Sequence, residues 1–425
     1  MARAALISAP HKHLAAPFYR RARYYLESDE QKGEGEHFVT LAHAQCCVLM
    51  SHYEVQNLWF SRSSMSTSKS VRLSQILGLH QLDGDSTWVQ NATLLPPKDW
   101  CEQEERRRVL WAVFCGDKNT SGTTGWPSLM DIKRINTLLP ASEEAFQLGM
   151  EEPAISVTQM LDGSIKSQSS HFTGRVLATH LFYECLDHTY HDHPDPNPTD
   201  TENSPFWIRR KDLDNGLATA FITLPDSLRA SAPSQEATTI NLQLHTASIC
   251  IHRVSAARAR KYNTPMDVIS GTQDRLIPAA DAIFGIVAAL PDVTAMFRNP
   301  LVAFAAYMAS YVFLEDCLAS HSKDSEMKMN ALMDLMITIG HENPVTASVA
   351  IQMAHELRRT GVDPSAVDKV RELMASTEIK GPLMGQQDRQ EGSVVFCPFE
   401  RASGDAPIGV PSMFPVPMND FGPVF

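Results

Sequence analysis

The sequence lacks the cysteine spacing that zinc sites and disulfide frameworks require. Its 425 residues contain eight cysteines, and no two of them form a C-x2-C pair. Apart from the adjacent Cys46 and Cys47, the cysteines are widely scattered. Zinc-binding and disulfide-rich modules need closer or more regular spacing. We therefore predict reduced, mostly buried thiols and no metal or other cofactor held by this chain.

The chain also has a shortage of positive charge. Lysine and arginine number 37 against 49 aspartate and glutamate residues, which gives a formal net charge of −12. Because a negative protein repels a polyanion unless its cations are sharply localised, the composition argues against stand-alone DNA binding. The hydrophobic content of 43% and the charged content of 20% are ordinary for a globular protein, so we expect most of the chain to fold.

Long hydrophobic runs are missing as well. The most apolar segments, "IFGIVAAL" and "LVAFAAYMASYVFL", are shorter than the roughly 20 residues that a membrane-spanning helix needs. The first segment of the chain, "MARAALISAPHKHLAAPFYRRARYYLE", lacks the continuous apolar core of a secretory signal. We therefore predict core helices and no association with a membrane.

Alternation of apolar and polar residues, the pattern of a half-buried strand, is nearly absent. Apolar residues instead recur at steps of three and four, for example over residues 239–261 and 299–319. The predicted fold class is therefore all-α, a large multi-helix body with irregular loops.

The predicted domain organisation has three parts. An N-terminal extension covers residues 1–16, and a helical domain covers residues 17–380, with an exposed polar loop at about 186–205. Residues 381–425 contain seven prolines and no helical period, so we expect a disordered tail.

Motifs for catalysis are also lacking: the sequence contains no H-E-x-x-H, no G-x-S-x-G and no aspartate-rich metal motif. One cluster could bind a metal, because His188, His191 and His193 lie close to Asp192 and Asp195. A metal site needs rigid geometry and supporting contacts, which a proline-broken segment does not supply. We therefore predict a polar loop and no enzyme, and keep an all-α metal-dependent enzyme using this loop as an alternative.

The segment "EERRRVLWAVFCGDKNTSGTTGWP" suggests a phosphate-binding loop at first sight. In such a loop the lysine follows the last glycine and a strand precedes it, whereas Lys118 comes before the later glycines and follows a helical segment. Glu102 and Glu104 stand four residues before Arg106 and Arg108, the spacing that favours ion pairs along a helix. The segment therefore predicts an internally paired helix that runs into a structured loop.

The same segment resembles the helical regulatory region of the fungal zinc-cluster transcription factors, often called the middle homology region. That family carries the pattern E-x-RRR-x-WW-x-x-F-x-x-DR…GRP, and Lys118 and Trp126 replace two of its arginines here. The elements "RRARYYLE" and "VRLSQILGLHQ" resemble motifs that precede this pattern in the family, in the same order. The matching positions of the signature are Arg106, Arg107, Arg108, Trp111, Phe114, Asp117, Gly125 and Pro127.

The resemblance implies a nuclear transcriptional regulator, of the kind that controls a secondary-metabolite gene cluster, particularly a polyketide one. The family's zinc belongs to an N-terminal cluster of six cysteines, which this sequence does not show, since its first cysteine is Cys46. The implied contact with DNA is therefore indirect or made by a missing domain.

The resemblance also implies partners. These are a homodimer or heterodimer with zinc-cluster regulators, the transcription machinery, and a small-molecule effector that a helical body could hold between its helices. A scaffold or dominant-negative partner of full-length regulators remains an alternative.

Overall fold

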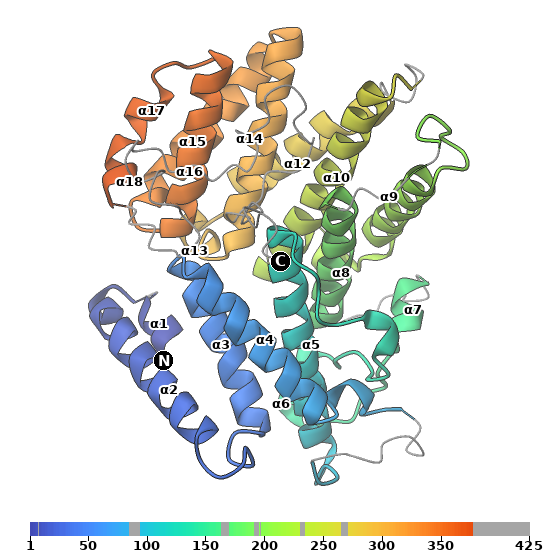
Figure 1. Ribbon diagram of the computed structural model, residues 1–425, viewed down its shortest axis with the longest axis vertical. Helices are drawn as coiled ribbons and strands as arrows, with labels where there is room; N and C mark the ends of the chain where they lie inside the picture. Colours follow the sequence, from blue (N-terminus) through green and yellow to red (C-terminus); the bar gives the residue numbers. More distant parts are fainter. Residues whose placement is uncertain are drawn as a thin grey trace, which may run out of the picture. The chain divides into compact units, whose positions relative to one another are not determined.

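A computed structural model shows the chain as an assembly of helices (Figure 1). Every regular element among the described residues is an α- or 3₁₀-helix, which confirms the predicted all-α class. The proline-rich tail, predicted at 381–425, lies outside these residues. The structure describes residues 1–6, 8–84, 94–162, 170–190, 195, 197–229, 234–264 and 271–376.

The helices divide into two compact units, each built from three segments of the chain. Unit 1 comprises Met1–Thr120, Pro127–His180 and Thr219–Ala237. Unit 2 comprises Ser121–Trp126, Leu181–Ala218 and the chain from Thr238 onward. The helical domain at 17–380 stays a prediction, and the chain passes between the two units within long helices as well as through a loop.

Unit 1 contains the N-terminal helices and most of the long helix α5. Its elements are α1 (Ala2–Leu6), η1 (Ala9–Leu14), α2 (Ala15–Glu30), α3 (Leu41–Gln56), α4 (Phe60–Ile76), η2 (Leu79–Gln81), α5 (Trp100–Thr124) up to Thr120, η4 (Ile132–Arg134), α6 (Glu143–Leu148), α7 (Val157–Leu161), the first half of α8 (His171–Tyr190), and η5 (Asp226–Leu228).

Residues 1–16, predicted as an N-terminal extension, lie in unit 1. Their helices α1 and η1 pack against α2, and the side chains of Ala5 and Ala15 are buried in the hydrophobic core. Leu6 and Leu14 pack against the same core. Small alanine side chains permit this close approach, which the apolar periodicity of so short a segment did not reveal.

Local signals explain where the helices of unit 1 begin and end. The Thr40 side chain accepts a hydrogen bond from the His43 amide at 3.2 Å, so α3 begins at Leu41. Gly78 lies beyond α4 with φ of 71°, the left-handed conformation in which glycine commonly ends a helix. At the start of α5 the Glu102 amide donates to the Asp99 side chain at 2.9 Å, which caps the helix.

Unit 2 is dominated by a run of antiparallel helices. Neighbouring pairs α14 with α15 and α15 with α16 pack against each other, and each helix starts at a side-chain cap: Asn299, Ser322 and Asn343. The elements are the second half of α8, α9 (Pro205–Thr223) up to Ala218, α10 (Gln235–Lys261) from Thr238, α12 (Leu276–Ala288), α13 (Val293–Met296), α14 (Pro300–Ser320), α15 (Lys323–Gly340), α16 (Pro344–Thr360), α17 (Ala366–Lys369) and α18 (Arg371–Ser376).

Helix α14 is the one described helix that is long and apolar enough to cross a membrane by length and composition. Its most apolar stretch is 72% buried inside the protein. The helix packs against α12, α15 and α16, which cover it within unit 2. Packing inside this unit therefore accounts for its apolar surface, as the sequence predicted for this segment.

Candidate functional site

The candidate site is the signature segment, which begins with α5 in the core of unit 1. Trp111 and Phe114 are fully buried, and their ring centroids lie 5.3 Å apart in an edge-to-face arrangement. The Trp111 indole Nε1 donates a hydrogen bond to the Leu138 carbonyl at 2.8 Å. The tryptophan thus anchors the loop that follows α5 as well as filling the core.

The three arginines of the signature all form ion pairs within unit 1. Arg106 pairs with Glu102 at 2.7 Å and Arg108 pairs with Glu104 at 3.1 Å, so both predicted pairs along the helix are present. All three guanidinium side chains are at most 15% exposed. The arginines are therefore engaged inside the domain and do not form an open patch for phosphate.

Arg107 reaches a partner that the sequence did not suggest. Its Nε donates to Asp83 Oδ2 at 2.9 Å, and its Nη2 donates to the other oxygen of the same carboxylate. Asp83 also accepts from the Leu138 amide at 2.8 Å and from the Gln103 side chain at 3.2 Å. Burial alone would raise the pKa of Asp83, but these hydrogen bonds, with Arg107 first, hold it below its ordinary value.

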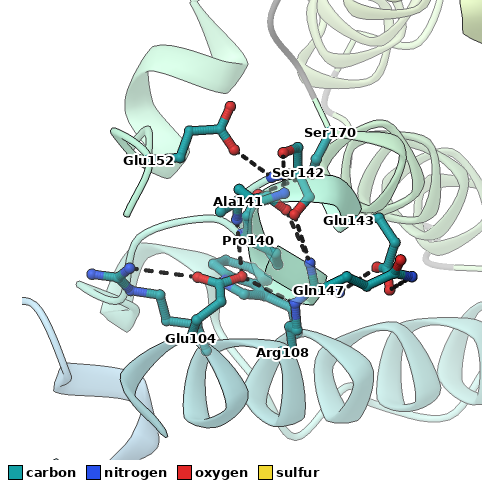
Figure 2. A network of polar contacts seen from close by, with 12 residues as sticks. Glu104, Arg108, Pro140, Ala141, Ser142, Glu143, Gln147, Glu152 and Ser170 are labelled. Atoms are coloured by element: carbon teal, nitrogen blue, oxygen red, sulfur yellow. Dashed lines mark hydrogen bonds and ion pairs between the residues drawn. The ribbon is translucent and has the colours of Figure 1, made fainter. Parts of the chain in front are cut away.

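Glu104 is the buried acidic partner of this network (Figure 2). Its carboxylate accepts from the Ala141 amide at 2.9 Å and lies 3.5 Å from Arg107. Burial raises the pKa of Glu104 despite the charges of Arg107 and Arg108, which lower it. One carboxylate thus joins the first half of α5 to the loop that returns past it.

Arg108 holds the same loop from the other side. It donates to the carbonyls of Ala141 and Ser142 at 3.1 and 3.2 Å, and it pairs with Glu143 at 2.7 Å. Its guanidinium also lies 4.2 Å from the ring centroid of Phe146. Figure 2 shows how these contacts join α5 to the start of α6.

Two further hydrogen bonds hold the same loop at Pro140 and Ser142. The Ser142 amide donates to Glu152 at 2.8 Å, and the Ser170 hydroxyl donates to the Pro140 carbonyl at 2.9 Å. These contacts are drawn in Figure 2 on the side opposite α5. The loop is therefore fixed on both sides within unit 1.

Asp117 organises the turn after α5. Its carboxylate accepts from the Ser128 hydroxyl at 2.6 Å and from the Leu129 and Met130 amides at 3.1 Å. Lys118, which replaces the family's arginine, donates to the same Ser128 hydroxyl at 2.8 Å. Burial raises the pKa of Asp117, and these bonds partly offset that rise. The segment is therefore a closed turn, not a phosphate-binding loop.

Gly125 and Pro127 end the signature, and Gly125 belongs to unit 2. Gly125 has φ of 73°, and a side chain there would place its Cβ 3.2 Å from the ring of Tyr190. Pro127, in unit 1, is exposed. The glycine is thus required both by backbone conformation and by a neighbouring aromatic ring.

The prediction of an exposed loop at 186–205, which contains the histidine cluster, needs correction. Helix α8 continues to Tyr190, and His188 is buried with its ring stacked on Phe206 at 4.4 Å. His191 and His193, with Asp192, lie outside the described residues. His188 packs against the aromatic ring of Phe206 and is therefore buried. The polar residues around it in the sequence did not indicate this contact.

The side chain of Asp195, the other acidic member of that cluster, is 4% exposed. Its carboxylate pairs with Arg258 at 2.8 Å and accepts from the Ser204 hydroxyl at 2.6 Å. The guanidinium of Arg258 lies 4.4 Å from the ring centroid of Phe206. Within the described part of the chain, no group of three or more histidine, cysteine or acidic side chains could hold a metal ion.

The cysteines follow the sequence prediction. The seven cysteines of the described residues are free thiols, and five of them are buried. Burial raises the pKa of Cys47 and Cys250 to about 12, so these thiols stay protonated near neutral pH. Cys397 lies outside the described residues.

Comparison with known proteins gives a match for the part of the chain that contains this geometry. Residues 8–190 match the fungal specific transcription factor domain, so this part of the chain is similar to that family. The match contains the whole signature and all of its partners described above.

The chain is also similar to individual proteins. The chain is similar to the pigment biosynthesis transcriptional activator pigB of Monascus ruber, with 34% identity over 146 residues that cover 34% of this chain and 26% of that protein. It is also similar to the sorbicillinoid biosynthetic cluster transcription factor 1 of Penicillium rubens, with 25% identity over 431 residues that cover 92% and 68%.

A third relative is the citrinin biosynthesis transcriptional activator mrl3 of Monascus ruber. It is 27% identical over 185 residues, which cover 44% of this chain and 35% of that protein. The chain thus spans between about a quarter and about two thirds of the length of these three relatives.

Proposed function

We propose that the protein is a nuclear transcriptional regulator of a fungal secondary-metabolite gene cluster. The observation that carries the proposal is the match of residues 8–190 to the fungal specific transcription factor domain. Relatives whose names refer to pigment, sorbicillinoid and citrinin biosynthesis support the choice of a secondary-metabolite cluster.

The chemistry of the signature supports a regulatory rather than a catalytic role. Its arginines, Trp111 and Asp117 all bond to other parts of unit 1. Catalysis and DNA recognition both need groups that can reach a substrate or a phosphate. These side chains instead maintain the shape of a domain that acts through its surface.

For a similar reason, we propose that another polypeptide or module recognises the DNA. With a net charge of −12, the chain has no general attraction for DNA. The partners we propose are a second copy or a zinc-cluster regulator that reads the DNA, and the transcription machinery that receives the signal.

Gene deletion followed by transcript sequencing tests the proposal. We expect the transcripts of one contiguous biosynthetic cluster to change together by at least about fivefold, with a matching change in one metabolite. Deletion that leaves every such cluster unchanged, under conditions where the gene is expressed, contradicts the proposal.

A complementation series links the effect to the domain. Restoring the gene with Arg108→Ala should fail to recover the transcripts, because this change releases the loop that follows α5. Arg134→Ala is the matched control, since the Arg134 side chain is 85% exposed, and it should restore them fully. Equal protein levels of the two variants, checked by immunoblot, separate loss of function from loss of protein.

A further inference from the structure

Helix α4 in unit 1 carries positive charge but no negative charge. Residues 60–76 contain Arg62, Lys69 and Arg72 and no aspartate or glutamate. Lys69 pairs with Glu30 on α2 at 2.6 Å, whereas Arg62 and Arg72 are exposed and form no ion pair with any described residue. In a chain with a net charge of −12, this helix is therefore a local excess of cations.

The same side of α4 exposes apolar side chains. Met65 keeps 59% of its surface accessible, and Ile76 keeps 42%. Together with the two unpaired arginines they recur at steps of three, seven and four residues, which places all four side chains along one face of the helix. Exposed apolar side chains that recur along one face, rather than singly, are typical of an interaction surface.

Side-chain contacts hold α2 beside this face of α4. The Arg23 guanidinium on α2 donates to the Ser66 hydroxyl at 3.2 Å. Trp59 directly precedes α4, and its ring centroid lies 5.3 Å from that of Tyr19 on α2 and 5.4 Å from the Arg62 guanidinium. These contacts and the ion pair described above join the two helices along their length.

Helix α2 adds a cation and an aromatic ring to this surface. Tyr19 and Leu26 are buried in the core of unit 1. Arg20 lies one turn before Arg23, on the edge of α2 that faces α4, and Tyr24 lies one turn after Arg20. Both are exposed, Tyr24 by 68%, and Arg20 forms no ion pair with any described residue. Both helices thus present unpaired arginine beside an exposed apolar group.

Three carboxylates beside this surface have cations of their own. Glu27 lies 2.7 Å from Arg23, and the buried Glu54 lies 3.6 Å from the same guanidinium. Glu30 is the partner of Lys69. The unpaired arginines are therefore available to carboxylates of another molecule.

We propose that this surface docks an acidic peptide segment of a partner protein. We call it the arginine surface, and its members are the three unpaired arginines and the three exposed apolar side chains: Arg20, Arg62, Arg72, Tyr24, Met65 and Ile76. Carboxylates of the peptide bind the guanidinium groups through charge-assisted hydrogen bonds. Leucine or aromatic side chains between those carboxylates pack against Met65 and its apolar neighbours.

The composition of the arginine surface favours a peptide over other occupants. A nucleic acid presents a continuous row of phosphates, and three separated arginines neutralise few of them. It also offers little to an exposed methionine and isoleucine. A second copy of this chain brings another net charge of −12 toward the first, which opposes self-association. Among these occupants, the acidic peptide supplies carboxylates and apolar side chains next to each other.

Docking at the arginine surface goes beyond the proposed function and does not depend on it. Binding is a property of residues in unit 1, and it is measured with the purified full chain. The transcript experiment above tests the cellular role, so either proposal can fail without affecting the other.

Fluorescence anisotropy with a labelled peptide of repeating Asp-Asp-Leu-Leu units tests the proposal on the full chain. We expect saturable binding that becomes at least about tenfold weaker when asparagine replaces every aspartate, because charge-assisted hydrogen bonds are lost. Serine in place of every leucine should weaken binding by at least about threefold, because apolar contacts are lost. Absence of saturable binding by the folded protein, or equal binding of either altered peptide, overturns the proposal.

Two double variants locate the docking surface. Arg20→Glu combined with Arg72→Glu should weaken binding of the Asp-Asp-Leu-Leu peptide by at least about tenfold, because two attractive charges become repulsive. Lys211→Glu combined with Arg260→Glu is the matched control, since it makes the same change of net charge at exposed residues of unit 2. This control should leave binding unchanged. If the two double variants bind the peptide equally, the proposed surface is wrong.

Two exposed methionines provide a test of the apolar contacts. Met65→Gln should weaken binding of the same peptide by at least about threefold, because a polar amide replaces the apolar side chain. Met327→Gln, on α15 in unit 2, is the matched control, because Met327 is 60% exposed and Met65 is 59% exposed. The control should bind as the original chain does. Equal binding by the two variants overturns the proposal.

Two further measurements test the other occupants. A labelled DNA duplex with the same net charge as the peptide should bind at least about tenfold more weakly, and equal or tighter binding overturns the proposal. Analytical ultracentrifugation of the full chain measures self-association, and we expect none that depends on the arginine surface. A dimer that Arg20→Glu with Arg72→Glu separates into monomers would assign the surface to a second copy and overturn the proposal.

Discussion

At the scale of single residues, Trp111 does two things in unit 1 that can be separated experimentally. Its ring fills the core, and its indole N–H bonds the Leu138 carbonyl. Trp111→Phe removes the donor and part of the ring, so the free energy of unfolding should fall by about 1–3 kcal/mol. Urea unfolding followed by circular dichroism measures the change.

A second tryptophan provides the control for that measurement. Trp126 is half-buried, and Trp126→Phe should change the free energy of unfolding by less than about 0.5 kcal/mol. If both substitutions have the same effect, the bond to Leu138 does not stabilise the loop.

His52 predicts a pH dependence of stability. Burial, followed by the charges of Arg3 and Arg175, lowers its pKa from 6.5 to about 4 in the folded chain. The unfolded chain therefore binds a proton more readily between these values, and stability is lost as the pH falls from about 6.5 to 4. Below about pH 4 this contribution no longer changes.

The urea midpoint at pH 7 and pH 5 measures this effect. Between these two values the midpoint of the original chain should fall further than that of His52→Asn, which cannot take up the proton. His11→Asn, at an exposed position, should follow the original chain. An equal fall in all three proteins would show that His52 does not titrate as described.

At the scale of helices and turns, two glycines with nearly equal backbone conformations allow a matched comparison. Gly78 and Gly125 have φ of 71° and 73°, but only Gly125 faces a ring that a side chain would meet. Gly78→Ala should cost about 1 kcal/mol from backbone strain. Gly125→Ala should cost about 1–3 kcal/mol more from crowding against Tyr190. Thermal unfolding of both variants tests the difference, and equal costs would exclude a contribution from the ring.

Elements whose determinants are close in sequence were predictable. The cap at Asp99, the end of α4 before Gly78 and the pairs of α5 depend on residues within one or two turns of each other. The order of the signature elements added a resemblance to a family, whereas the fold class followed from apolar periodicity. These features are local, and local chemistry can be read without knowing how the chain folds back on itself.

The features that could not be predicted depend on contacts between distant parts of the sequence. Arg107 pairs with Asp83, 24 residues earlier, and Arg258 pairs with Asp195, 63 residues earlier. His188 looked like part of a polar loop because its stacking partner, Phe206, comes later in the chain. No periodicity or spacing specifies such pairs, so the polar network of the site and the true extent of α8 could not be predicted.

At the scale of the whole molecule, the sequence predicted one helical domain, whereas each unit draws on three separated segments. A boundary between domains is recognised in sequence by a linker, and here the chain crosses between the units within α5 and α8. The division therefore leaves no signal in the sequence.

The net charge of −12 predicts how the whole chain behaves toward DNA. We expect a dissociation constant weaker than about 100 µM for any duplex at about 150 mM salt, because few phosphates can be neutralised. Fluorescence anisotropy with a labelled duplex of about 20 base pairs measures it. Sub-micromolar binding with a steep salt dependence would show a localised basic surface that the charge balance conceals.

The carboxylate of Asp83 has a consequence for genetic suppression. It bonds Arg107, the Leu138 amide and Gln103 together, so it serves three segments of the chain. Exchanging the two charges, by Asp83→Arg with Arg107→Asp, restores attraction between the pair but leaves the Leu138 amide without an acceptor. The double exchange should therefore not rescue either single variant in a complementation assay. Revertants of Asp83→Asn are then expected to restore aspartate itself rather than to arise at its partner.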